Sequence, residues 1–260
     1  MKKCIWCNKT EDEVTFLKLA HTIPKSLGGL KTCDNVCDIC NAFFGSHYQR
    51  LPPVETVIKE TFNISRARLL SSTDKIGKNE ALPRFSSIYF KVDFKKNKID
   101  LNSSYKYHST FQEKICRQLK KGLYKIYLEE IERQKGKGHD PQFDFIREFS
   151  RYNLGDYPVF YFERLHGIFL MSEQWVKHPE LFMDEETQFR YLVREPSFFE
   201  FELLGHVFAI ATSRHWELAF DNYIRKSMAA KKKQFRRWRL VEKFNDIDLS
   251  LSILDDHIRL

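Results

Sequence analysis

The spacing of apolar residues predicts helices over much of the chain. Between 54 and 62 they recur at the i, i+3, i+4 interval of a helix face. Ser109 or Thr110 caps a longer stretch of the same spacing that runs to Gly136. A further helix is expected over 141–153. The polar residues between these segments predict turns and linkers.

Alternation of apolar and polar residues predicts strands in the second half. Residues 88–94 and 99–101 form a hairpin signature, with lysines and an asparagine at the turn over 95–98. Further short strands are expected at 159–162, 168–171, 189–193, 200–204 and 206–212. Together these segments predict an α+β arrangement, in which an antiparallel sheet packs against helices.

A dense run of basic residues lies near the carboxyl end. We interpret 214–243 as one long helix, with Phe235 and Trp238 among its cations. A charged run of this kind can be a solvated helix face, or it can neutralise nucleic-acid phosphates. The formal net charge of +8 and the isoelectric point near 9.1 favour a polyanionic partner. The candidate phosphate contacts are Lys231, Lys232, Lys233, Arg236, Arg237 and Arg239.

The candidate chemistry is concentrated near the amino end. Two C-x2-C pairs, Cys4 with Cys7 and Cys37 with Cys40, are separated by about thirty residues. Paired knuckles at this separation are typical of a structural zinc site with four thiolate ligands. The alternative is a set of buried free thiols, since cysteine packs well as a small hydrophobic residue.

The segment between the two pairs adds a histidine and two asparagines. A short apolar run from 17 to 22 predicts a strand that ends at His21, and Gly28 and Gly29 follow as a turn. Asn35 precedes the second pair. Asn41 directly follows the last cysteine and opens a helix expected over 41–50.

About the first 45 residues resemble the HNH endonuclease family, in its four-cysteine zinc branch. The resemblance is carried, in order, by H-T-I-P-K-S-L-G-G, Asn35 and C-D-I-C-N. The resemblance implies a ββα-metal module. We therefore divide the chain into an HNH module at 1–64, a linker at 65–85 and an α+β accessory domain at 86–260. The accessory domain is expected to recognise nucleic acid through its basic carboxyl-terminal helix.

The resemblance also implies roles for individual residues. His21 would be the general base that activates water, Asn35 would hold the loop and orient His21, and Asn41 would be a ligand of the catalytic divalent ion. Lys25, in the same motif, is assigned to nucleic-acid contact. At the position before the histidine the family usually has a metal-binding Asp or Glu, and this chain has Ala20.

The missing carboxylate leaves the ligand set of the catalytic ion open. The remaining candidates are Asn41, the DNA phosphates, and the nearby His47, Asp34 and Asp38. For His47 a solvent-facing or phosphate-contacting role is the alternative. Mg²⁺ prefers oxygen ligands, whereas Mn²⁺ or Ni²⁺ suits a site richer in nitrogen.

Composition gives an expected setting for this chemistry. Cysteines in metal-like pairs, with Cys33 and Cys116 elsewhere, suit a reducing cytoplasm. We expect no signal peptide, no membrane partner and a globular core, given a hydrophobic content of 42%. Two functions compete: a metal-dependent DNA endonuclease of restriction or phage defence, and a DNA-binding protein whose HNH module is impaired by Ala20. RNA is a less favoured partner, and a homodimer is compatible with cutting both strands.

Overall fold

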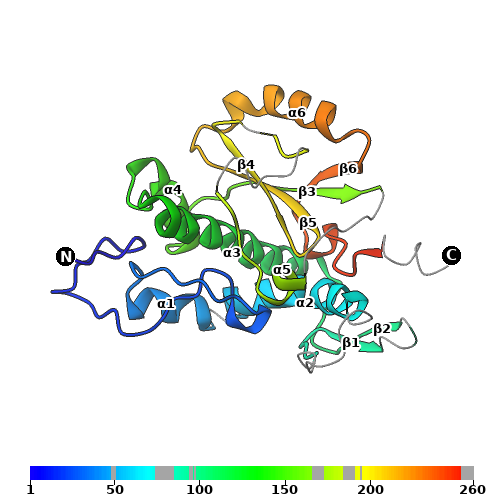
Figure 1. The fold of residues 1–260 in the computed structure, drawn as a ribbon, viewed down its shortest axis with the longest axis horizontal. Coiled ribbons are helices and arrows are strands. Elements are labelled where there is room, and N and C mark those ends of the chain that lie inside the picture. Colours follow the sequence, from blue (N-terminus) through cyan, green and yellow to red (C-terminus); the bar gives the residue numbers. More distant parts are fainter. Residues whose placement is uncertain are drawn as a thin grey trace.

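The computed structural model describes residues 1–47, 51–73, 85–93, 96, 98–165, 173–183, 191–193 and 195–252. The helices are α1 (Asp38–Gly45), α2 (Val54–Thr73), α3 (Ser109–Lys135), α4 (Asp144–Ser150), α5 (Glu173–Lys177) and α6 (Glu217–Lys231). The strands are β1 (Phe90–Asp93), β2 (Lys98–Leu101), β3 (Val159–Arg164), β4 (Phe198–Leu203), β5 (His206–Ala211) and β6 (Phe235–Leu240). The predicted mixture of helices and antiparallel strands is confirmed (Figure 1).

The amino-terminal module is less regular than the sequence predicts. The strand expected to end at His21 is reduced to a single bridge between His21 and Thr32. After it the chain turns through a short 3-10 helix to Gly28, whose φ of 86° is a left-handed conformation that glycine adopts without a steric penalty. The helix expected over 41–50 is α1, which ends at Gly45, and 48–50 lie outside the described residues.

Helix α2 corrects the predicted linker at 65–85. It continues to Thr73, and residues 74–84 lie outside the described part of the chain. Its second half is packed, because Arg66 donates from Nε to the Val176 carbonyl oxygen (3.0 Å). Arg66 and Arg68, two of the polar residues that suggested a linker, therefore join α2 to later segments.

Helix α3 is the longest helix in the described part of the chain. The side chain of His108 caps it, accepting a hydrogen bond from the Phe111 amide (3.2 Å), so the predicted cap at Ser109 or Thr110 is wrong by one residue or two. It ends at the predicted Gly136, whose φ is 64°. Pro141 begins a short 3-10 turn that leads into α4, as predicted.

A four-stranded antiparallel sheet in the order β4-β5-β3-β6 lies above α3 in Figure 1. Alternate residues of β3 face opposite layers, with Phe160 in a cluster shared with α6 and Tyr161 in a cluster shared with α2 and α3. Strands β1 and β2 form a separate hairpin that pairs Phe90 with Leu101, as predicted. The strand expected at 168–171 and the first two residues of the one expected at 189–193 lie outside the described residues, and 191–193 do not form a strand.

The long helix predicted over 214–243 is wrong. Helix α6 ends at Lys231, a turn follows, and the basic residues 235–240 form β6 at the edge of the sheet. Strand β6 pairs with β3, Trp238 lying opposite Phe162. Backbone bonds to β3 and the burial of Phe235 outweigh the local helical preference of this run.

The main hydrophobic cluster joins the amino-terminal module to the rest of the chain. It contains Trp6 and Phe44 from the module, Phe62 from α2 and Tyr124 from α3. The module therefore shares its core with the segment that the sequence assigned to an accessory domain. Within the described ranges, no helix has both the length and the apolar character that a bilayer crossing requires.

Candidate functional site

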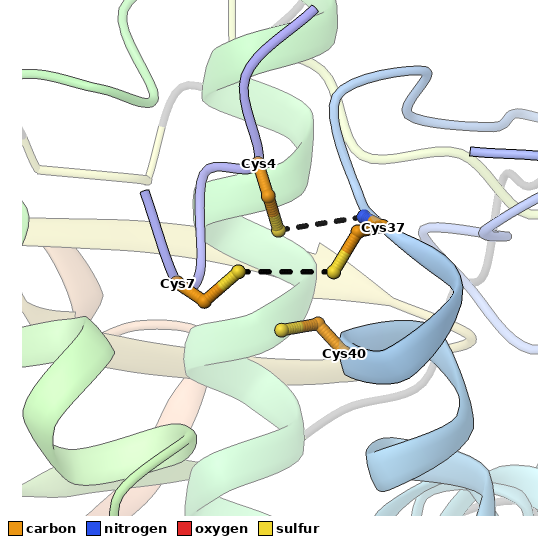
Figure 2. Close-up of side chains that lie close together, drawn as sticks. All are labelled: Cys4, Cys7, Cys37 and Cys40. Carbon is orange, nitrogen blue, oxygen red and sulfur yellow. Dashed lines mark hydrogen bonds between the residues drawn. The ribbon is translucent and has the colours of Figure 1, made fainter. Parts of the chain in front are cut away.

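The four cysteines predicted to bind zinc lie together. Their sulfur atoms all lie within 4.8 Å of one another, and Cys7 Sγ is 3.7 Å from Cys37 Sγ (Figure 2). A tetrahedral zinc with Zn–S bonds of about 2.3 Å would hold its sulfurs about 3.8 Å apart. The donor set and the spacing thus fit one structural zinc ion, held by two residues from the amino-terminal turn and two from the start of α1.

Hydrogen-bond donors reach two sulfur atoms of the cluster. The Cys37 amide donates to Cys4 Sγ, and Arg151 Nε donates to Cys40 Sγ, both at 3.4 Å. A hydrogen bond from Cys40 lowers the pKa of Cys4 to about 4, whereas burial raises the pKa of Cys37 to about 11 and the bond to Cys4 raises the pKa of Cys40. Cys33 and Cys116 lie outside this cluster, and burial raises the pKa of Cys116 to about 12, so it stays a thiol.

Helix α1 links the metal ligands to the candidate active site. Cys37 is its N-cap and Asn41 lies one turn in, where Nδ2 donates to the Leu19 carbonyl oxygen (3.2 Å). This bond holds the helix against the segment that leads into half-buried His21. It uses the amide nitrogen of Asn41, and the amide oxygen is the atom that suits a hard cation.

Asn35 anchors its loop to α3. Its Nδ2 donates to Glu132 Oε1 (2.5 Å), and its carbonyl oxygen accepts from the Ile5 amide (2.9 Å). Glu132 also accepts from the Gly138 amide (2.7 Å). The loop-holding role expected of Asn35 thus has a structural partner on α3.

The other candidate ligands of a catalytic ion differ in their surroundings. Asp38 accepts from Thr15 Oγ1 (2.5 Å) and from the Lys18 amide (2.8 Å), and the Thr15 bond, with smaller contributions from Lys18, lowers the pKa of Asp38. Its carboxylate therefore fixes the amino-terminal loop. His47 lies beyond the end of α1, where Nδ1 is 3.1 Å from the Leu51 carbonyl oxygen, so it does not share the helix face of Asn41. Asp34 is exposed on the loop before the second cysteine pair.

Ala20 is buried, with 1% of its surface exposed. Its carbonyl oxygen accepts from the Cys33 amide (2.9 Å), which ties the His21 segment to the loop that returns toward the second cysteine pair. A carboxylate at this position would be buried. Its charge would destabilise the fold unless a cation or a hydrogen-bond donor lay beside it.

A row of buried charged residues on α3 supports the His21 segment, and no expectation from the sequence included it. Lys125 Nζ donates to the His21 carbonyl oxygen (2.9 Å) and to Glu129 Oε2 (2.8 Å). Glu129 in turn accepts a hydrogen bond from Nε1 of Trp6 (3.1 Å), which lies between the first two cysteines in the sequence. The adjacent Glu130 accepts from Thr22 Oγ1 (2.5 Å).

This row connects the cysteine cluster with the His21 segment through helix α3. Burial alone would lower the pKa of Lys125, but Glu129 and Glu55 raise it, so the ammonium stays charged. One signal in the sequence could have revealed this row of charged residues. The spacing of Lys125, Glu129 and Glu132 places them on the same side of a helix among apolar residues.

The basic residues predicted to bind phosphate differ in their exposure and in their partners. Lys231 is buried, 2.6 Å from Glu200 Oε2, so its assignment to phosphate contact is wrong. Lys232 and Lys233 are exposed, and so is Lys25 near the His21 segment. Three arginines of β6 surround Glu163 at 3.7, 2.6 and 3.3 Å, namely Arg236, Arg237 and Arg239.

Comparison with known proteins bears on the amino-terminal module. Residues 4–50 match the HNH endonuclease family. No curated protein and no solved structure matches the chain. The matched range contains all four clustered cysteines together with His21, Asn35 and Asn41. Residues 4–50 therefore form a module that matches the HNH endonuclease family and contains a cysteine cluster that fits zinc, and this match supports a nuclease-type function.

Proposed function

We propose that the protein is a metal-dependent HNH endonuclease that hydrolyses DNA phosphodiester bonds, in restriction or phage defence. The observation that carries the proposal is the family match at 4–50, together with the hydrogen bond that holds Asn41 of α1 against the His21 segment. The net charge of +8 and the exposed cations of β6 support a nucleic-acid substrate.

In this proposal His21 takes a proton from the attacking water, and the Asn41 amide oxygen is a ligand of the catalytic ion. Asn35, bonded to Glu132, keeps the loop in place around them. A bound Mg²⁺, Mn²⁺ or Ni²⁺ would stabilise the negative charge that develops on the scissile phosphate. Lys125 of α3 donates to the His21 carbonyl oxygen. His21 is therefore held by α3 as well as by its own loop.

The second candidate function is a DNA-binding protein with an impaired HNH module. The buried Ala20 favours it, because the family's anionic ligand is absent at that position. Plasmid cleavage assayed with Mg²⁺, Mn²⁺ and Ni²⁺ separates the two. Cleavage by the wild type supports the first candidate. Binding without cleavage, with cleavage gained in Ala20→Asp, supports the second.

Ala20→Asp is expected to make the stability of the protein depend on divalent cations. The new carboxylate would be buried, so it should lower the melting temperature of the zinc-loaded protein when no further cation is present. Added Mn²⁺ should restore the melting temperature and bind more tightly than to the wild type. Differential scanning fluorimetry measures both effects. Ala20→Asn is the matched neutral control, and an equal response to Mn²⁺ in the two variants would refute the prediction.

Removal of the exposed cations near β6 is expected to weaken binding to all DNA sequences alike. A variant with Gln at Lys232, Lys233, Arg236 and Arg237 should also flatten the dependence of affinity on salt, by about 0.9 in the log–log slope for each phosphate that the variant no longer neutralises. Fluorescence anisotropy at several salt concentrations gives both values.

The control for this variant is the buried Lys231. Lys231→Met removes the buried cation paired with Glu200, so it should lower the free energy of unfolding by about 3 kcal/mol. The salt slope of the folded protein should stay as in the wild type. If the fourfold variant kept the wild-type slope, β6 would be a solvated surface and not a DNA contact.

A further inference from the structure

A small apolar pocket opens between the end of α6 and the edge strand β6. Its volume is about 220 Å³, and Phe162, Met228, Phe235 and Trp238 contribute to its wall. From the sequence, Phe235 and Trp238 are expected only as aromatic residues interleaved in a basic helix. In the structure they lie on a strand beside a hollow that none of the described segments fills.

The aromatic wall is held in place by packing. Trp238 contacts Phe160 edge-on, with ring centroids 5.5 Å apart, and contacts Phe220 of α6 at 6.3 Å. Phe162 and Phe235 pack against each other at 6.0 Å. Trp238 is nonetheless only half-buried, and Met228 is 56% exposed, so apolar surface remains open to solvent on both sides of the pocket.

The rim of the pocket is positively charged and its floor is neutral. Lys231 lies 4.6 Å from the Phe162 ring centroid, but Glu200 balances its charge. Lys232, Arg236 and Arg237 also line the pocket. Arg236 and Arg237 share the single carboxylate of Glu163 with Arg239, which leaves the three arginines with an excess of positive charge.

We propose that this pocket receives one unpaired nucleobase of the DNA, with the cations of its rim on the neighbouring phosphates. The proposal rests on the proposed DNA substrate and narrows it to DNA that contains an unpaired nucleotide. Apolar walls with an aromatic ring suit the face of a base, and a rim of three cations complements the strand that carries it. A cavity of this volume is smaller than the usual range of small-molecule pockets, which fits a single ring system.

The position of the pocket at the protein surface also requires the base to lie outside the stack of a duplex. A base inside a duplex is stacked on both faces and cannot enter a pocket in a protein surface unless it leaves the stack. A bulged or mismatched nucleotide leaves the stack at the smallest cost. In Figure 1 the sheet and α6 lie on one side of α3, and α1 lies on the other. The pocket would thus bind the DNA apart from the site of cleavage.

The test compares two labelled DNA duplexes that differ only in one bulged thymine, with binding measured by anisotropy in the absence of added divalent cation. The wild type should bind the bulged duplex roughly tenfold more tightly, as expected for one stacked base. Trp238→Leu and Met228→Glu should both bring this ratio close to one. Leu218→Glu, which adds the same charge to a 91% exposed position on the same helix, should keep the wild-type ratio.

Two results would overturn the proposal: a wild type without preference for the bulged duplex, or a preference that survives in both pocket variants. Tighter binding of an RNA of the same sequence would overturn the choice of DNA. Met228→Glu keeps the test valid if Trp238→Leu fails to fold, because Met228 is largely exposed. Cleavage by the wild type and by His21→Ala is assayed separately. Loss of the bulge preference with normal cleavage refutes only the pocket, and bulge preference without cleavage refutes only the nuclease.

Discussion

Replacement of His21 by alanine is expected to lower the rate of DNA cleavage by about 10²- to 10⁴-fold, the range typical for loss of a general base. The side chain is half-buried at the end of a segment held by Asn41 on one side and by Lys125 on the other. Single-turnover cleavage of a supercoiled plasmid, with each of Mg²⁺, Mn²⁺ and Ni²⁺, gives the rate. DNA affinity and zinc content should stay at wild-type values, because the imidazole is not one of the clustered metal ligands.

The matched control is His215→Ala, which removes an exposed imidazole two residues before α6. It should cleave at the wild-type rate. Robust cleavage that survives in His21→Ala would defeat the assignment of the active site. If the wild type itself does not cleave with any of the three ions, the impaired module becomes the better description.

Loss of the zinc ligands is expected to unfold the amino-terminal module and to weaken the rest of the fold. Cys4→Ser or Cys40→Ser should reduce the zinc content from one ion per chain to none. In small zinc modules metal binding supplies much of the folding free energy. Trp6 and Phe44 belong to the same hydrophobic cluster as Tyr124 of α3, so the loss should also lower the main melting temperature, by about 10 °C or more if several kcal/mol are lost.

Elemental analysis and thermal unfolding measure the two effects. Cys116→Ser is the matched control, because Cys116 is a buried thiol outside the cluster that donates to the Val241 carbonyl oxygen (3.4 Å). It should retain one zinc ion per chain. A purified wild type without zinc, or a Cys40→Ser variant with full zinc and an unchanged melting temperature, would contradict the prediction.

The sequence by itself determined features whose cause is local. Cys4, Cys7, Cys37 and Cys40 could be assigned to one site because metal ligands in knuckles recur at short fixed spacings, and the structure brings their sulfurs together. Helix α3 and its end at Gly136 follow from periodic apolar residues and from a position that requires a left-handed backbone. The roles of His21 and Asn41 stay predictions drawn from the family's motif.

Only the tertiary structure decided how the site is supported. Lys125 and Glu129 look like ordinary exposed charges of a helix, yet they lie in the core and hold Trp6 and the His21 backbone. Their spacing in the sequence indicates only a shared helix face, and their environment depends on segments more than a hundred residues away. Lys125 keeps its charge because Glu129 and Glu55 lie beside it, whereas burial raises the pKa of Glu129 to about 7.

The basic run near the carboxyl end shows the same limit. Its composition permits a helix, but residues 235–240 form an edge strand because β3 offers them backbone hydrogen bonds and a surface on which Phe235 is buried. Lys231 was expected on a binding surface and is instead neutralised inside by Glu200. Which cations remain exposed, and the pocket they surround, thus depend on pairing between distant segments, whose free energy exceeds the small differences in local propensity.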